Sequence, residues 1–312
     1  TNCLSTPALS GPGRYIDVTA ASSIMLFGFA ITNEINNVDI AIMETGLGGR
    51  LDSVTVCNPV LTIITPISLD HTEILGNSIE KIAYEKAGIM KARVPCVTAH
   101  QHENVYSVLQ QHASSLNCEL ICAHGNILHN TNPSLMGKYQ FENACLAATS
   151  LQFLQGFNVS DENIKQGIEQ TTWFGRNEII QKEPLVIFDV GHNESGIKGF
   201  LDYFKGMNDS ETSILIISLQ RRKSIMNVVP KLLDAFDYII CCETDNLRTM
   251  TLDEMATQFG KPKKILYIKS TKDAINKGLS LLQSNTDKMA IVGTHHFGGP
   301  ISTIFNKSFN TL

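Results

Sequence analysis

Short apolar runs alternate with helix-length segments through the second half of the chain, after Trp173. The runs are residues 185–188, 214–218, 238–242, 265–268 and 289–292. The intervening segment 196–207 carries apolar side chains at positions i, i+3, i+4 and i+7, which is the spacing of one helix face. Repeated alternation of buried strands and helices predicts parallel sheets covered by helices, with right-handed crossovers.

The first half shows the same elements less regularly. Residues 38–43 and 60–64 are apolar runs of the length expected for buried parallel strands. Pro and Gly residues predict a loop at 5–13, and helical spacing predicts helices at 18–29 and 137–154. The capping residues of 160–163 open a further helix. The fold class predicted for the whole chain is therefore α/β.

Length and composition indicate two domains. A chain of 312 residues with 43% hydrophobic content can bury a core in each of two ordinary domains. Turn-forming residues near 171–175 mark the boundary, so we expect one domain at 1–172 and a second at 173–312.

Charge and cysteine usage exclude several function classes. The formal net charge of −5 and the scattered lysines leave no basic surface for nucleic acid. Apolar runs of bilayer-spanning length and a secretory leader are both missing from the sequence, so we expect no membrane partner. The eight cysteines form no CxxC pair, which indicates reduced thiols and a cytoplasmic protein.

Polar residues follow two of the predicted strands of the first domain. Glu44 ends one strand and is followed by a glycine cluster that reaches Asp52, and His71 comes after the strand that ends near Thr65. Ligands bind beyond the carboxyl ends of parallel strands, so Glu44 and His71 are candidates for holding a divalent ion. The alternatives are a tight turn for the glycines and a loop hydrogen bond for the histidine.

A helix predicted from Asn77 carries an inward-facing lysine. Asn77 and Glu80 have the spacing of a capping box. Lys86 completes the apolar stripe, and burial lowers an amine's pKa, which favours the neutral form that reacts with carbon dioxide. The alternative is that Lys86 extends past its neighbours to pair with Glu85 or Asp70.

The second domain offers another polar strand end. Asp189 could accept from a ribose hydroxyl or hold a metal-bound water, while His192 and Arg176 could donate to phosphate oxygens. Asp189 or Asn193 could equally cap the following helix. The adjacent pair at 295–296 is expected to be solvated loop histidines.

Taken together, these motifs resemble the folylpolyglutamate synthase/dihydrofolate synthase branch of the Mur ligase superfamily. The matching stretches are ETGLGGRLD at 44–52, DHTEILG at 70–76, EKAGI at 85–89, GKYQ at 137–140 with Asn143, GR at 175–176 and DVGHN at 189–193. The weaker stretches NLR at 246–248 and GT at 293–294 extend the resemblance over nearly the whole chain.

The resemblance implies a ligase that phosphorylates a carboxylate with ATP and then joins it to L-glutamate. The expected substrates are folate or dihydropteroate, the expected cofactors are ATP and Mg²⁺, and the expected state is a monomer. The implied metal ligands are Glu44, His71 and carbamylated Lys86, and the implied ATP contacts are Asn143, Arg176, Asp189 and His192. Lys86, His71 and Arg176 are the implied catalytic residues. The implied fold is a truncated Mur-ligase central ATPase domain followed by a Rossmann-like C-terminal domain.

Three departures from the family pattern bear on activity. The family's phosphate-binding loop precedes the Glu44 strand, but no Gly-Lys-Ser or Gly-Lys-Thr sequence occurs in these 312 residues. The usual Ala-Thr-Asn is replaced by residues 53–55 (SVT), and the usual DGAHNP appears as DVGHNE at 189–194. We therefore expect these residues alone to be catalytically poor. Two rival interpretations are a cell-wall Mur ligase and a degenerate member that binds only nucleotide or a partner.

Overall fold

The computed structural model describes residues 14–19, 39–125, 130–154, 156–207, 211–221 and 223–309, with only the backbone described for 14–19. The chain forms two compact units. Unit 1 comprises Thr1–Asn132 and Glu142–Glu169, and unit 2 comprises Pro133–Phe141 and Gln170–Leu312. The predicted boundary between residues 172 and 173 stays a prediction, and each unit is described by itself.

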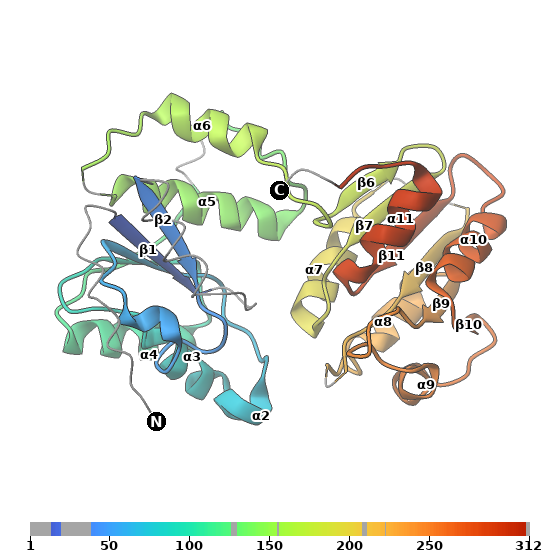
Figure 1. Ribbon diagram of the computed structural model, residues 1–312, viewed down its shortest axis with the longest axis horizontal. Coiled ribbons are helices and arrows are strands. Elements are labelled where there is room, and N and C mark those ends of the chain that lie inside the picture. Colours follow the sequence, from blue (N-terminus) through green and yellow to red (C-terminus); the bar gives the residue numbers. More distant parts are fainter. Residues whose placement is uncertain are drawn as a thin grey trace, which may run out of the picture. The chain divides into compact units, whose positions relative to one another are not determined.

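Unit 1 contains a five-stranded parallel sheet in the order β2-β1-β3-β4-β5. Its neighbouring strands β1 and β2 are labelled in Figure 1. Its strands are β1 (Arg14–Thr19), β2 (Ile40–Glu44), β3 (Leu61–Ile64), β4 (Cys96–Thr98) and β5 (Leu120–Cys122). The apolar runs predicted at 38–43 and 60–64 thus form neighbours of β1. The helix predicted at 18–29 is wrong at its start, because Val18 and Thr19 lie in β1. Both are β-branched residues, which favour extended backbone. The remainder of that helix, and the loop predicted at 5–13, lie outside the described residues.

Helices cover both faces of this sheet. They are α2 (Thr72–Leu75), α3 (Ile79–Ala87), α4 (Glu103–Ser115), α5 (Lys138–Gln152) and α6 (Asp161–Gln170), with the 3-10 helix η1 at Ser53–Val56. One core joins α3 and α4 to β3 and β4 through Ile82, Leu109 and Ile64. A second core places Leu146 of α5 on the other face, and α6 packs on α5. The helices predicted at 137–154 and from 160 are confirmed.

Unit 2 contains a six-stranded sheet in the order β10-β9-β8-β11-β7-β6. Its strands are β6 (Glu178–Gln181), β7 (Leu185–Asp189), β8 (Ser213–Ile217), β9 (Tyr238–Cys242), β10 (Ile265–Ile268) and β11 (Lys288–Val292). Strand β6 is antiparallel to β7, whereas the other pairings are parallel. The five strands predicted after Trp173 are therefore confirmed.

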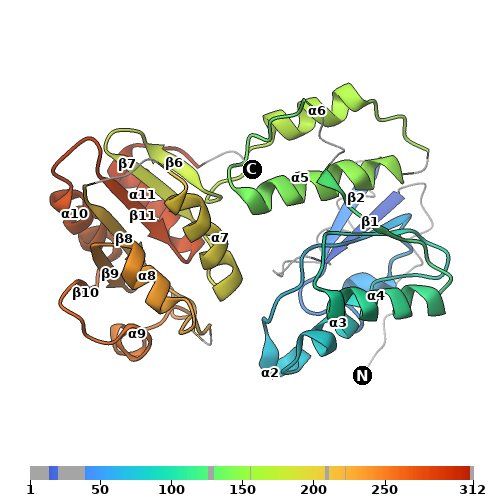
Figure 2. The same cartoon turned by 180° about the vertical axis from the view of Figure 1, so that it is seen from behind.

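The helices of unit 2 divide between the two faces (Figure 2). They are α7 (Glu194–Lys205), α8 (Val229–Ala235), α9 (Leu252–Phe259), α10 (Thr271–Leu281) and α11 (Gly298–Phe305), with the 3-10 helix η3 at His295–Phe297. The first three share one core, into which α7 inserts the predicted stripe of Ile197, Phe200, Leu201 and Phe204. Helices α10 and α11 cover the other face. Because β11 returns to a place between β8 and β7, the strand order reverses there, and such reversals favour ligand binding beyond the carboxyl ends.

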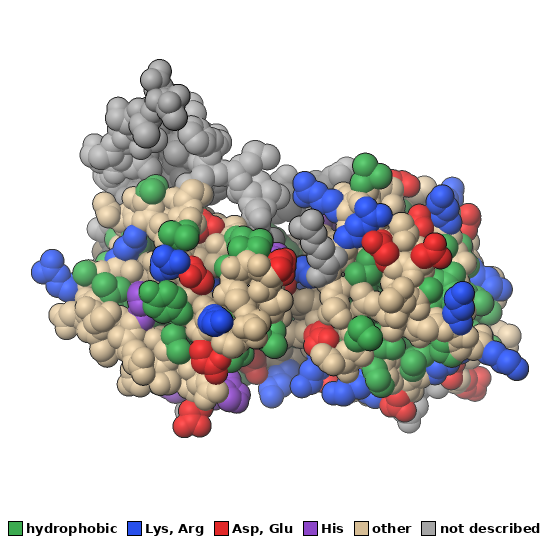
Figure 3. All heavy atoms as spheres, turned by 90° about the horizontal axis from the view of Figure 1, so that it is seen from below, with side chains coloured by type: hydrophobic (Ala, Val, Ile, Leu, Met, Phe, Trp, Pro, Cys, Tyr) green, Lys and Arg blue, Asp and Glu red, His purple; other side chains and the backbone are tan. Residues whose placement is uncertain are grey.

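The face shown in Figure 3 intersperses acidic, basic and apolar side chains. The helices of the described residues all fall short of the length and apolar character that a membrane-spanning helix needs.

Candidate active site

Glu44 and the segment leading to His71 leave the sheet of unit 1 at the same edge. Glu44 ends β2 and is aligned with Val18 of β1, which is aligned on its other side with Ile63 of β3. The chain beyond β3 then reaches His71, which precedes α2 in a left-handed conformation (φ 50°). Parallel strands thus bring Glu44 and the start of the segment that leads to His71 to one edge of the sheet. Glu44 is exposed and His71 is half-buried.

Asp52 organises the loop that follows Glu44. Its Oδ2 accepts from the backbone N–H groups of Gly46 and Leu47, each at 2.9 Å, and its Oδ1 accepts from Val54 N–H at 3.0 Å. A carboxylate that receives three amide donors fixes the loop around itself. In the sequence, Asp52 stood out only as the end of a motif. The available signal was an Asp at the N-cap position of a short helix.

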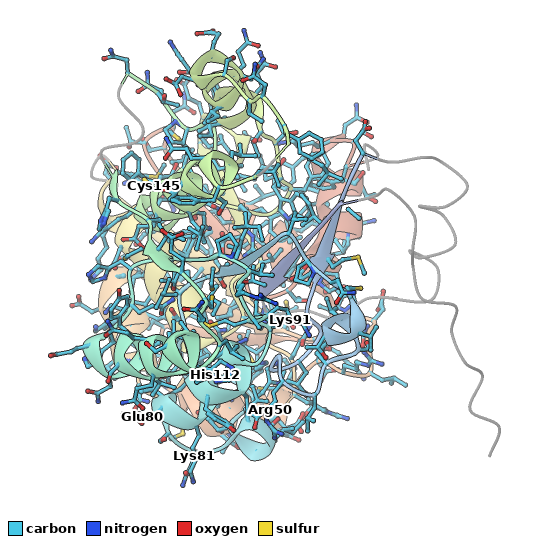
Figure 4. All side chains as sticks on the ribbon, turned by 90° about the vertical axis from the view of Figure 1, so that its left-hand side faces the viewer. Arg50, Glu80, Lys81, Lys91, His112 and Cys145 are labelled. Atoms are coloured by element: carbon cyan, nitrogen blue, oxygen red, sulfur yellow. The ribbon has the colours of Figure 1, made fainter. Side chains whose placement is uncertain are left out.

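Glycines on both sides let this loop pack closely against α3. A Cβ added at Gly88 would lie 2.3 Å from the Cα of Arg50, and one added at Gly49 would lie 2.8 Å from the carbonyl oxygen of Glu85. Arg50 N–H donates to that same carbonyl at 2.7 Å, and its guanidinium pairs with the Glu85 carboxylate at 2.9 Å. Arg50, labelled in Figure 4, thus lies against α3. The loop is therefore fixed against the turn of α3 that carries Lys86.

Lys86 is half-buried, as the apolar stripe predicted. Burial lowers the pKa of its amine, and the carboxylates of Asp70 and Asp52 oppose that shift. Asp70 is thus an electrostatic neighbour, as one alternative held, whereas Glu85 pairs with Arg50.

The cap predicted for α3 is wrong by one residue. Ser78 is the N-cap, with extended backbone and a hydroxyl that accepts from Lys81 N–H at 3.4 Å. Asn77 instead accepts from the side chain of Lys81 at 3.3 Å. Both residue types favour caps, and the backbone conformation of Ser78 decides between them.

The donors at this edge are compatible with Mg²⁺ without forming a complete cage. Among the described residues, no three His, Cys, Asp or Glu side chains converge as a metal site. Mg²⁺ keeps several waters and takes one or two carboxylates together with substrate phosphates, so the exposed carboxylate of Glu44 at the end of β2 is a suitable donor. The assignment of Glu44, His71 and Lys86 as ligands stays a prediction.

In unit 2, the carboxylate of Asp189 is buried, with 2% of the residue exposed. Its Oδ2 accepts from Asn177 N–H at 2.9 Å and from the Tyr139 hydroxyl at 3.2 Å, and its Oδ1 accepts from Gly191 N–H at 2.7 Å. Burial raises the pKa of Asp189, and these donors together with Arg176 oppose the rise. The contribution of Tyr139 was not predicted from the sequence.

The cap of α7 is Asn193, whose side chain accepts from Gly196 N–H at 2.8 Å. Of the two capping candidates, Asn193 is therefore confirmed and Asp189 is not.

Arg176 and His192 lie on the two loops that flank Asp189. Arg176 is half-buried and follows Gly175, whose φ of 69° forms the turn. The Nδ1 of His192 lies 3.1 Å from the carbonyl oxygen of Val190, so this nitrogen carries the proton. A neutral His192 then presents Nε2 as an acceptor, and donation to a phosphate requires the imidazolium form.

The remaining candidates from the sequence are Asn143 and the histidine pair at 295–296. Asn143 is exposed on α5 in unit 1, whereas the other three predicted ATP contacts belong to unit 2. The prediction of solvated histidines holds for exposed His295 only. His296 is half-buried, and its Nε2 lies 2.8 Å from the amide nitrogen of Asn246, which donates to it.

Comparisons with known proteins agree with these motifs. Residues 175–295 match the Mur ligase glutamate ligase domain. The dihydrofolate synthase/folylpolyglutamate synthase of Bacillus subtilis is 34% identical over 224 residues, which cover 64% of this chain and 52% of the relative. A probable dihydrofolate synthetase of Schizosaccharomyces pombe is 30% identical over 238 residues, covering 69% and 57%. The chain belongs to the folylpolyglutamate synthase/dihydrofolate synthase family.

Solved structures share the fold of this family member. The Mycobacterium tuberculosis folylpolyglutamate synthase complexed with ADP has a TM-score of 0.80 at 23% identity, covering 89% of this chain and 70% of that one. Escherichia coli FolC in complex with DHPP and ADP also has a TM-score of 0.80, at 20% identity, covering 96% and 89%. The predicted α/β class, with a Rossmann-like C-terminal part, is confirmed. The chain spans 52% of the length of the Bacillus subtilis relative and 57% of the length of the Schizosaccharomyces pombe relative.

Proposed function

We propose that the protein containing this chain is an ATP-dependent ligase that joins L-glutamate to the carboxylate of folate or dihydropteroate. ATP transfers its γ-phosphoryl group to that carboxylate, the amine of glutamate attacks the resulting acyl phosphate, and phosphate leaves with one carboxylate oxygen. The observation that supports the proposal most directly is the burial of Lys86 on α3, which lowers the pKa of its amine although the carboxylates of Asp70 and Asp52, from the two loops that follow β3 and β2, act on it.

In unit 1, Glu44 and His71 would hold Mg²⁺, and carbamylated Lys86 would supply oxygen ligands to a second ion. Bound Mg²⁺ offsets negative charge on the phosphates. The protein's part is to hold these groups in place, since Asp52 orders the loop after Glu44 and Arg50 fixes it against α3. Desolvation favours the neutral amine that carbamylation requires, even beside acidic neighbours.

In unit 2, Arg176 and His192 would donate to phosphate oxygens, and Asp189 would orient the nucleotide. Arg176 suits this role because its half-buried guanidinium lies in the field of a buried carboxylate. Asp189 has one acceptor position left after three internal hydrogen bonds, which suits one ribose hydroxyl. Asn143 lies on α5 in unit 1, and its role as an ATP contact stays a prediction.

The cellular location that we propose for the enzyme rests on its cysteines. The seven described cysteines are free thiols, which supports a reducing, cytoplasmic setting. Small-molecule substrates and a monomer are part of the proposal.

The test is phosphate release that depends on both ATP and glutamate, with dihydropteroate or tetrahydrofolate as acceptor. The assay compares this 312-residue chain with the longest product of its gene, and then with His71→Ala and Arg176→Ala variants of the active form. We expect each variant to lose at least about a hundredfold in rate, the scale of a charge-stabilising group. Release that is absent from every form, or unchanged in both variants, would refute the proposal.

A further inference from the structure

Tyr139 connects the start of α5 to the buried carboxylate of unit 2. Its hydroxyl donates to Oδ2 of Asp189 at 3.2 Å. Its ring lies against α7, where a Cβ added at Gly199 would be 3.2 Å from the ring atom Cδ1. The side chain is thus held at both ends within unit 2, to which residues Pro133–Phe141 belong.

Asn177 ties the same segment to the same carboxylate. Its backbone N–H donates to Asp189, and its side-chain amide donates to the carbonyl oxygen of Met136 at 2.7 Å. Asn177 adopts a left-handed conformation with φ 48°, and Gly137 lies so close that an added Cβ would be 2.7 Å from the Asn177 amide. The side-chain amide of Asn177 therefore joins the segment before α5 to the turn that carries Arg176.

The three donors to Asp189 differ in what a mutation can remove. Two are backbone N–H groups, from Asn177 and Gly191, and the third is the Tyr139 hydroxyl. A carboxylate with 2% exposure needs such donors, because an ionised group removed from water is costly unless it is hydrogen-bonded. Tyr139 is therefore the side chain through which the orientation of this carboxylate can be tested.

We propose that Tyr139 is a positioning residue for nucleotide binding in unit 2, because its hydroxyl fixes Asp189 and, through Asn177, the turn that carries Arg176. The inference rests on the proposed function in one respect, which is that the loops around Asp189 bind nucleotide. Tyr139 itself need not touch the nucleotide.

Tyr139→Phe removes only the hydroxyl oxygen and its proton. We expect the dissociation constant for ADP to rise about tenfold, the scale of one hydrogen bond to a charged group. Titration of ADP is followed by the fluorescence of Trp173, the single tryptophan of the chain, which is 56% exposed and three residues from Arg176.

The pH profile adds a signature that general loosening would not give. The charged and titratable groups facing Asp189 are Arg176 and Tyr139. Burial already raises the pKa of Asp189, and loss of the Tyr139 donor raises it further. As pH is lowered, ADP affinity should therefore fall at a higher pH in the variant than in the unsubstituted chain.

Tyr203→Phe is the matched control. Tyr203 lies on α7 of the same unit, and its hydroxyl is buried without a hydrogen-bond partner among the described residues. The control removes the same atoms from the same unit without breaking a hydrogen bond, so ADP affinity and its pH profile should not change.

Amide hydrogen exchange without nucleotide separates this inference from the nucleotide proposal. Tyr139→Phe should speed exchange at the backbone N–H groups of Asn177 and Gly191, the remaining donors to Asp189, while Tyr203→Phe leaves both unchanged. If the unsubstituted chain binds no ADP, nucleotide binding by this chain fails and the exchange result alone decides the role of Tyr139. Exchange at both amides that is the same in Tyr139→Phe and Tyr203→Phe would overturn the inference.

Discussion

Gly88→Ala tests whether the glycine loop is fixed against α3. The new Cβ would lie 2.3 Å from the Cα of Arg50 and 2.4 Å from its Cβ, whereas carbon atoms pack at about 3.5–4.0 Å. The loop or the helix must move by more than about 1 Å, which also stretches the 2.7 Å hydrogen bond from Arg50 to Glu85. Overpacking of this kind costs about 1–3 kcal/mol, and the hydrogen bond adds about 1 kcal/mol.

Backbone conformation does not contribute to this cost. Gly88 has φ −61° and ψ −7°, which alanine adopts freely, so reduced unfolded-chain entropy returns about 0.4–1 kcal/mol. The expected net loss is about 2 kcal/mol in the free energy of unfolding. Urea unfolding followed by far-UV circular dichroism measures it, while Trp173 fluorescence follows unit 2 separately.

Gly167→Ala is the control in the same unit. Gly167 lies inside α6, and a Cβ added there meets nothing within 4 Å. Alanine should therefore stabilise this helix by about 0.5–1 kcal/mol. If Gly88→Ala is as stable as Gly167→Ala, the close approach of loop and helix is refuted.

Three further predictions concern the Lys86 site and the sheet of unit 2. Because burial lowers the pKa of Lys86, bicarbonate should activate the proposed ligase at a lower pH than an exposed lysine would allow, and Lys86→Gln should abolish this activation. Phosphate-release rates after preincubation with bicarbonate check this prediction, and equal activation of the variant would contradict it. Burial alone would raise the pKa of Asp287, but three backbone N–H donors hold that pKa below its ordinary value. The stabilisation that Asp287 gives the folded state is therefore fully present above the unfolded pKa of about 3.9, and it is lost as the pH falls through the folded pKa. Asp287→Asn should therefore lower the free energy of unfolding by about 1–3 kcal/mol at pH 7, as measured by urea unfolding. This difference from the unsubstituted chain should shrink in acid, and a difference that stays constant with pH would argue against the prediction. Gly293→Ala should cost about 3 kcal/mol, because φ is 117° and the new Cβ would lie 2.1 Å from the carbonyl oxygen of Ser218; unchanged thermal unfolding would exclude that contact.

The sequence predicted elements whose pattern is local. Buried parallel strands appear as continuous apolar runs, so the strand before Asp189 and those after it could be located, as could the buried stripe of α7. The half-burial of Lys86 followed from helical spacing alone. The cap of α3 was misplaced because Asn77 and Ser78 are adjacent residues of equal capping preference.

The rest depended on contacts between distant residues. The glycines at 49 and 88 are explained by one loop-helix contact that spacing does not reveal. The donors to Asp189 come from positions 139, 177 and 191, so its burial and full hydrogen bonding required the fold. The sequence could suggest the Asp189 carboxylate as a ligand contact. It could not show that three hydrogen bonds within the protein already occupy most of the acceptor positions of that carboxylate.

The most direct test of the proposed chemistry follows one oxygen atom. The acceptor folate or dihydropteroate is labelled with oxygen-18 in the carboxylate that receives glutamate, and the full product of the gene containing this chain is supplied with ATP and L-glutamate. An acyl-phosphate ligase moves one labelled oxygen to inorganic phosphate while a glutamyl product forms, and mass spectrometry detects both. Glutamyl product accompanied only by unlabelled phosphate, or no glutamyl product at all, would contradict the account.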